Sequence, residues 1–188
     1  MTEFTIHTEE STPEASKHLV RAIKNKSGFL SNLFAVQSES PAMLEGYVTL
    51  TEIFNKTNLS ETERQIILMT NNRLNGCTYY MAAHTTISQL GKVPADVIEA
   101  LRNGTAIADS KLEALRVFAV RMNETRGWVE QSDLDAFFAA GYDKASVLDV
   151  ILGTSLKVLS NYTNHIAQTP VDAAFRANTW SPIDSDAA

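Results

Sequence analysis

The chain has very little cysteine and no long apolar run, and each shortage excludes a class of protein. A single cysteine in 188 residues cannot form a disulfide within the chain. No uninterrupted apolar segment approaches the roughly 20 residues that a membrane-spanning helix needs. Residues 1–5 also lack the basic and then apolar order of a signal peptide. We therefore expect a cytoplasmic protein.

The chain also has too few basic residues for an electrostatic footprint that would bind nucleic acid or a membrane surface. Lysine and arginine number 16 against 22 acidic residues, which gives a formal charge of −6, and both signs are interspersed. Neither nucleic acid nor a membrane is therefore an expected partner. The eight glycines form no phosphate-binding cluster. The histidines are scattered, with no carboxylate at ligand spacing from His84, so we expect neither a metal nor another cofactor.

What the sequence does contain is a series of helix signals. Ser40-Pro41 and the capping box from Ser60 to Glu63 each predict a helix start. The segment from Lys144 to about Ala167 reads as one long helix, in which Gly153 indicates close packing against another helix. Alternation of apolar and polar residues, which strands require, rarely extends beyond four positions. The sequence predicts an all-α protein.

Length and composition predict one domain over residues 1–188. At about 44% apolar residues, a chain of this length can bury a sizeable core. Residues 169–188 lose the helical periodicity and are expected to pack as an extended arm or to fray. Trp180 in this tail needs a partner, which is either a subunit interface or a groove within the chain.

The stretch from Asn75 to His84 carries the candidate chemistry. Asn75-Gly76 is a turn signal, so a helix should begin at or beside Cys77. His84 follows seven residues later, and at about 100° per residue Cys77, Tyr80 and His84 share one helix face. A thiol in the first turn lies near unpaired backbone N–H groups, which should lower its pKa from about 8.5. Tyr80, at i, i+4 spacing, is the expected in-helix partner of His84.

At these residues the sequence resembles the AhpD-like family, also called the carboxymuconolactone decarboxylase family. The signature of that family is a glutamate about three helical turns before Cys-x-x-Cys, then three residues and a histidine. Here Leu74-Asn75-Gly76-Cys77 and Ala82-Ala83-His84 match in register. Tyr80 stands at the position of the second cysteine, and Gln65 at that of the glutamate. The match lies mainly in residues 41–92, and it implies an AhpD-like helical bundle that forms a homo-oligomer, with dimer, trimer and hexamer all open.

The resemblance implies thiol-dependent reduction of hydroperoxides, with Cys77, His84, Tyr80 and Gln65 as the site residues. Without a second thiol, Cys77 would need an external thiol reductant or a partner cysteine for turnover. Gln65 cannot act as a base, but its amide can orient His84.

Two further functional readings remain open from the sequence. One alternative is a lyase or isomerase of the carboxymuconolactone decarboxylase type, in which Tyr80 and His84 move protons. Another is an oligomeric binding protein that has lost its chemistry. In the last long helix, Asn161 and His165 share a face. They either complete the site from across the core or mark a helix end in solvent.

Overall fold

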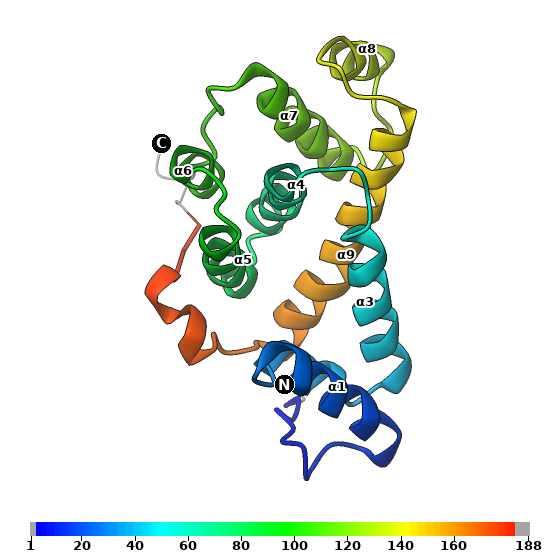
Figure 1. The fold of residues 1–188 in the computed structure, drawn as a ribbon, viewed down its shortest axis with the longest axis vertical. Coiled ribbons are helices and arrows are strands. Elements are labelled where there is room, and N and C mark those ends of the chain that lie inside the picture. The colour runs from blue at the N-terminus through cyan, green and yellow to red at the C-terminus, as the bar shows by residue number, and fades with distance from the viewer. Residues whose placement is uncertain (1–2, 183–188) are drawn as a thin grey trace.

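The computed structural model describes residues 3–182, and within that range it consists of helices without strands (Figure 1). This confirms the predicted all-α class. Short 3-10 helices are labelled η. The elements are, in chain order, η1 (Glu14–Ser16), α1 (Lys17–Ser27), α2 (Asn32–Gln37), α3 (Pro41–Phe54), α4 (Glu61–Leu74), α5 (Thr78–Leu90), α6 (Ala95–Asn103), α7 (Ser110–Glu124), α8 (Gln131–Ala139), α9 (Lys144–Ala167) and η2 (Ala173–Asn178).

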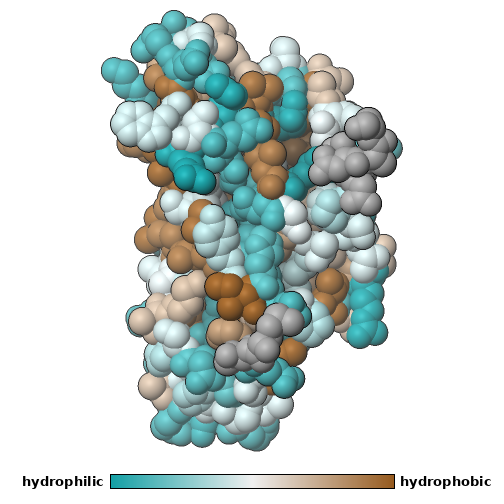
Figure 2. All heavy atoms as spheres, turned by 180° about the vertical axis from the view of Figure 1, so that it is seen from behind, coloured by the Kyte–Doolittle hydropathy of each residue, from teal (hydrophilic) through white to brown (hydrophobic). Residues whose placement is uncertain are grey.

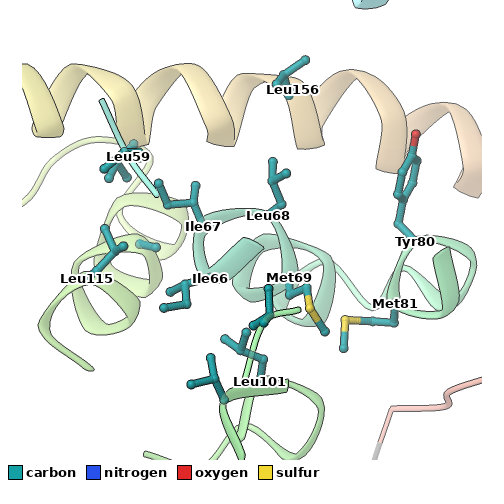
Figure 3. Close-up of a cluster of buried hydrophobic side chains, with 14 of the residues drawn as sticks. Leu59, Ile66, Ile67, Leu68, Met69, Tyr80, Met81, Leu101, Leu115 and Leu156 are labelled. Carbon is teal, nitrogen blue, oxygen red and sulfur yellow. The ribbon is translucent and has the colours of Figure 1, made fainter. Parts of the chain in front are cut away.

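Helix α4 is the centre of the bundle, with α5, α6, α7 and α9 packed against it (Figure 1). Its buried residues form one continuous segment from Gln65 to Asn72 rather than a single stripe, because the helix is covered all round. Figure 3 shows Ile66, Leu101 and Leu115 meeting on one side of α4, while Leu156 lies on α9 across the core. The site residues on α4 are therefore held by packing from several directions.

The predicted helix starts are made by side-chain caps. The Ser60 hydroxyl accepts a hydrogen bond from the Glu63 backbone N–H, and the Glu63 carboxylate accepts one from the Ser60 N–H, which completes the capping box. The Ser40 hydroxyl accepts from the Met43 N–H at the start of α3. The Asp143 carboxylate accepts a hydrogen bond from the Ser146 backbone N–H and so caps α9, which begins at Lys144 as predicted.

Gly153 lies where α9 approaches α3 and α4 most closely. A Cβ atom at this position would be 2.7 Å from Cγ2 of Ile67 and 2.9 Å from Cζ of Phe54. Only glycine allows the α9 backbone to come this near. The close packing predicted from Gly153 is confirmed, and it sets how deeply the inner face of α9 enters the core.

The C-terminal arm runs along α5 and binds to it (Figure 1). The Asp172 carboxylate accepts a hydrogen bond from the Tyr79 hydroxyl at 2.5 Å and another from the Asn32 N–H. Trp180 donates its indole N–H to the Arg102 carbonyl and lies 5.8 Å from the Arg73 guanidinium. Of the two alternatives for Trp180, the structure shows the groove within the chain. Residues 183–188 of the predicted arm lie outside the described residues.

Several large apolar side chains are exposed at the surface of the described residues. On the face of the molecule that Figure 2 shows, apolar residues lie in separate groups among polar ones. The most exposed are Trp128, Leu90, Ile166 and Leu148. None of the described helices combines the length and apolarity that crossing a bilayer would demand.

Candidate functional site

Cys77 lies in the turn between α4 and α5. Asn75 ends α4, Gly76 adopts a φ of +63°, and Cys77 is the N-cap residue of α5. The left-handed backbone at Gly76 favours glycine, which explains the Asn-Gly signal. The predicted helix start at the cysteine is confirmed. The Cys77 side chain is only 1% exposed.

The surroundings of the Cys77 sulfur are polar, but they do not lower its pKa as the sequence predicted. The Asn164 side-chain N–H donates to Cys77 Sγ at 3.8 Å. Burial raises the pKa of the Cys77 thiol, and this outweighs the opposing effects of the Tyr80 backbone N–H and the Lys157 charge. The prediction from the helix terminus alone was wrong, because the same turn that places the thiol at the terminus also removes it from water.

His84 is held between Gln65 and Lys157. Its Nδ1 lies 2.8 Å from Gln65 Oε1, and its Nε2 lies 2.8 Å from Lys157 Nζ. Gln65 donates its own amide N–H to Glu61, so Gln65 Oε1 is left as the acceptor for His84 Nδ1–H. This pattern assigns the proton of the neutral imidazole to Nδ1, and Nε2 accepts from Lys157. Gln65 therefore contacts and orients His84 as expected from its amide chemistry.

The protonated imidazole is unfavourable at this position. Burial, together with the charge of Lys157, holds the pKa of His84 well below its usual value. His84 is thus neutral at physiological pH and serves as a hydrogen-bond acceptor for the amine.

Tyr80 does not make the predicted hydrogen bond with His84. Its hydroxyl lies 2.7 Å from the Tyr47 hydroxyl on α3, and Figure 3 shows the ring directed from α5 towards α9. The Tyr80 and His84 rings are in contact, with centroids 5.1 Å apart. Burial and the neighbouring Tyr47 and Tyr79 raise the pKa of Tyr80 well above its usual value. Tyr80 is therefore a neutral wall of the site, because α3 supplies a better-placed partner than the next helical turn.

Lys157 is the site residue that the sequence analysis missed. It is 1% exposed, and its Nζ lies 3.8 Å from the centroid of the Tyr80 ring. Burial lowers the pKa of Lys157 to about 7, so that both its charged and neutral forms are populated near neutral pH. The signal was present in the sequence, since Lys157 falls on the inner stripe of α9 with Val150, Gly153, Ser160, Asn161 and Asn164.

A chain of amides leads from the surface to the turn at Cys77. Asn123 donates to Asn75, Asn75 to Asn161, and Asn161 to Asn72. Asn72 then donates to the backbone carbonyl of Tyr80. Because a carbonyl can only accept, the direction of every amide in the chain is fixed. The chain holds the Asn75–Cys77 turn against α9.

Asn75 and Asn123 also line a cavity of about 660 Å³ with Arg126, Thr154 and Tyr162. This cavity is open to solvent, and Asn75 is separated from Cys77 only by Gly76.

The two candidate residues in the last part of α9 have different positions. Asn161 is buried in the amide chain beside Cys77, whereas His165 is exposed. Of the two residues, only Asn161 therefore reaches the site. Among residues 3–182, no cluster of three or more histidine, cysteine, aspartate or glutamate side chains could hold a metal ion.

Comparison with known proteins identifies the fold. No family profile and no curated protein sequence matches the chain. The AhpD core of a peroxidase-related protein from Ralstonia eutropha JMP134 superposes with a TM-score of 0.81 at 18% identity, covering 92% of this chain and 93% of that chain. A peroxidase-related protein from Silicibacter sp. TM1040 gives 0.80 at 16% identity, covering 94% of each chain.

A third similar structure is a cysteine-to-alanine variant of the debrominase Bmp8 in complex with 2,3,4-tribromopyrrole. Its TM-score is 0.78 at 15% identity, with 95% of this chain and 96% of that chain covered. The protein has the AhpD-like fold, and the expectation drawn from the Cys77 and His84 motifs is confirmed at the level of the fold.

Proposed function

We propose that this protein is a thiol-dependent oxidoreductase of the AhpD-like type, in which Cys77 reduces a hydroperoxide and an external thiol restores it. The observation that carries the proposal is the buried contact between the Lys157 amine and His84 beside Cys77. A lysine, a thiol and a neutral imidazole are costly to bury together. A group of this kind is typical of a site where proton transfer matters.

Lys157 is the proposed acceptor of the thiol proton. With a pKa of about 7 its neutral amine is available near neutral pH, whereas the Tyr80 hydroxyl keeps its proton. Proton transfer from Cys77 to Lys157 converts two neutral groups into a thiolate and an ammonium ion. The ammonium then stabilises the thiolate, and His84 Nε2 keeps Lys157 Nζ in place by accepting a hydrogen bond.

The chemical step follows from this ion pair. The Cys77 thiolate attacks the terminal peroxide oxygen, the O–O bond breaks, and the leaving alkoxide takes a proton from Lys157. Sulfur loses two electrons and becomes a sulfenic acid, while the peroxide becomes an alcohol. One external thiol then displaces water to form a mixed disulfide, and a second thiol releases reduced Cys77. An external thiol is required because Tyr80 occupies the position of the second cysteine.

The acid–base alternative receives less support. Tyr80 and His84 are both held neutral and do not share a hydrogen bond. The similar structures reported above are two peroxidase-related proteins and a debrominase. Their descriptions give no support to a lyase reaction. Because Bmp8 binds a bromopyrrole, 2,3,4-tribromopyrrole belongs in the substrate panel beside the hydroperoxides.

The test is oxidation of reduced protein by hydrogen peroxide or cumene hydroperoxide, followed by trapping of sulfenic acid and mass spectrometry. We expect a single modified residue, Cys77, and continued peroxide consumption when glutathione or dithiothreitol is present. Cys77→Ser should abolish both results. An unmodified Cys77 under conditions that oxidise reactive thiols would contradict the proposal.

One further variant and one possible negative result separate the candidate functions. His84→Gln should slow the oxidation of Cys77, because Lys157 loses the acceptor that positions it. If that variant keeps full activity on any substrate that is found, the acid–base alternative is excluded as well. A protein that consumes no compound in the panel, yet folds normally, supports loss of chemistry.

A further inference from the structure

Glu61 lies at the outer end of a line of side chains that leads into the site. It is the first residue of α4, and its side chain is 37% exposed. Its Oε1 accepts a hydrogen bond from Gln65 Nε2 at 2.9 Å, one helical turn further on. From Gln65 Oε1 the line continues to His84 and then to the amine of Lys157, over two contacts of 2.8 Å. A carboxylate near the surface is therefore connected to the buried lysine through an amide and an imidazole.

The Glu61 carboxylate determines the orientation of the Gln65 amide. A carboxylate has no hydrogen to donate, so the NH₂ end of the amide must face Glu61. The amide oxygen then faces His84 Nδ1, which must carry the imidazole proton. The Ser88 hydroxyl lies 3.4 Å from the same oxygen, but a hydroxyl either donates or accepts and would fit both orientations of the amide. Between Glu61 and Ser88, only Glu61 is restricted to one role.

The place of the proton on His84 matters because Lys157 changes its proton state in the proposed reaction. An ammonium group only donates, so it needs a ring nitrogen that accepts. A neutral amine has a lone pair, and it would accept from His84 if the imidazole proton were on Nε2. In that arrangement the lone pair would be occupied and could not take the proton of Cys77. With the proton on Nδ1, His84 Nε2 accepts from Lys157 both before and after the transfer.

We propose that Glu61 is a positioning residue of the site. Through the Gln65 amide it keeps the proton of His84 on Nδ1, so that the lone pair of neutral Lys157 stays free for the thiol proton. The effect on the thiol rests on the proposed function of Cys77 and Lys157, whereas the effect on His84 does not.

The first experiment reads the tautomer of His84 by nitrogen-15 NMR of histidine-labelled protein. The chain has four histidines, and His84→Gln assigns the signal. At mildly alkaline pH, where Lys157 is mostly neutral, we expect a protonated Nδ1 and an unprotonated Nε2. Glu61→Met removes the acceptor but keeps the length of the side chain, and both shifts should move towards each other as the second tautomer is populated. Unchanged shifts in this variant, or a wild-type proton on Nε2, would overturn the proposal.

A control variant separates this role from the ion pair at the start of α4. The second oxygen of Glu61 lies 2.9 Å from Arg64 Nη2. Arg64→Met removes that ion pair and leaves the contact between Glu61 and Gln65 in place, so it should keep the single tautomer. An equal change in Arg64→Met and Glu61→Met would show that the ion pair is responsible, and the proposal would fail.

A rescue variant tests whether the effect of Glu61 passes through the amide. The double variant Glu61→Met with Gln65→Glu places an acceptor-only carboxylate directly at His84 Nδ1. It should restore the single tautomer that Glu61→Met loses. Failure to restore it would show that Glu61 does not act through residue 65, which would overturn the proposal. If Glu61→Met does not fold, Glu61→Ala takes its place, because alanine favours the helix.

The second experiment measures the thiol without any peroxide. Alkylation of Cys77 by iodoacetamide should be about fivefold slower in Glu61→Met, as for the loss of one hydrogen bond, and unchanged in Arg64→Met. Wild-type alkylation in Glu61→Met, despite an altered tautomer, would overturn the effect on the thiol. If the tautomer and the alkylation rate both change but no hydroperoxide is consumed, the peroxidase function fails and the role of Glu61 stands.

Discussion

Two tyrosines in this protein each have a lysine over the ring, and the two pairs differ in solvent access. Lys111 Nζ lies 4.9 Å from the Tyr142 ring centroid, and its side chain is 51% exposed. Lys157 Nζ lies 3.8 Å from the Tyr80 centroid and is buried. The first lysine also meets a carboxylate, since Glu63 Oε1 is 3.7 Å away. The second meets only neutral groups.

The surface pair supports the fold. Tyr142 stacks on Phe137, which stacks on Phe118, with centroid distances of 4.4 and 4.2 Å. The Tyr142 hydroxyl donates to Glu63 at the start of α4. The buried Tyr142 hydroxyl has a charged partner and the rings are stacked, so the cluster contributes stability.

The buried pair has a different effect. Lys157 forms no salt bridge with a carboxylate in the described structure. Its amine donates to His84 Nε2 and lies over the Tyr80 ring, and its charge lowers the pKa of Cys77 without offsetting the effect of burial. The same two residue types therefore stabilise the fold where the lysine is exposed, whereas the buried lysine is the proposed acceptor of the thiol proton.

The largest expected effect comes from removing Phe137, the middle ring of the buried stack of Phe118, Phe137 and Tyr142. Phe137→Ala should lower the free energy of unfolding by about 3–5 kcal/mol, because Phe137 is 1% exposed and its removal leaves a cavity. Urea unfolding measures this value. The rate of Cys77 oxidation in the folded variant should stay the same. A large loss of that rate would show that the two regions are coupled.

The next effect concerns the thiol. Lys157→Met should slow oxidation of Cys77 roughly tenfold to a hundredfold, because a neutral side chain neither accepts the thiol proton nor stabilises the thiolate. Stopped-flow oxidation with hydrogen peroxide measures the rate. Lys111→Met is the matched control and should leave it unchanged. Equal rates in both variants would remove the distinction between the two lysines.

A smaller effect is expected where α9 approaches α3 and α4. Gly153→Ala should destabilise the protein by about 1–3 kcal/mol, since the added Cβ overlaps Ile67 and Phe54. Gly46→Ala in α3 should instead stabilise it by about 0.5–1 kcal/mol, because no atom lies within 4 Å of a Cβ there. Thermal unfolding of both variants measures the difference. The same sign for both would contradict the packing described here.

The smallest effect is a change of stability with pH. The pKa of Lys157 falls from 10.5 in the unfolded chain to about 7 in the folded protein, so the unfolded state binds more protons between these values. Stability should therefore rise with pH above about 7, by on the order of 1 kcal/mol per pH unit. The raised pKa of Cys77 opposes this rise at pH values above the usual thiol pKa.

Urea unfolding between neutral and mildly alkaline pH measures this dependence. The Lys157→Met variant should lose the rise, whereas Lys111→Met should keep it. A wild-type stability that falls over this range would show that Lys157 stays charged in the folded state.

Most of the fold could be predicted from local signals. The Ser60 to Glu63 capping box and the Asn75-Gly76 turn depend on neighbouring residues, which is why both were found in the sequence. Gly153 also predicted close packing of α9. Glycine destabilises a helix interior relative to alanine, so its presence there indicates that another element approaches the backbone closely.

The environment of the site depended on contacts between distant segments. The pKa of Cys77 was predicted from its own helix, whereas Asn164 and Lys157 on α9, which contact or influence the thiol, lie 80 or more residues later in the chain. Tyr80 was matched with His84 by spacing, but Tyr47 on α3 provides its partner. Lys157 could not be placed in the site from local signals, because lysine is usually exposed and its burial depends on the packing of α9 against α4 and α5.

The direction of the amide chain has a consequence for the chemical ageing of the protein. Asn75 precedes Gly76, a pair in which the glycine nitrogen can attack the asparagine side chain and release ammonia. In the folded protein the Gly76 N–H is bonded to the Arg73 carbonyl, and the Asn75 amide is held by Asn161. An unfolded molecule loses both restraints. Once an aspartate forms at that position, two oxygens face each other where a donor met an acceptor, and the hydrogen bond that ties the thiol-bearing turn to α9 is lost.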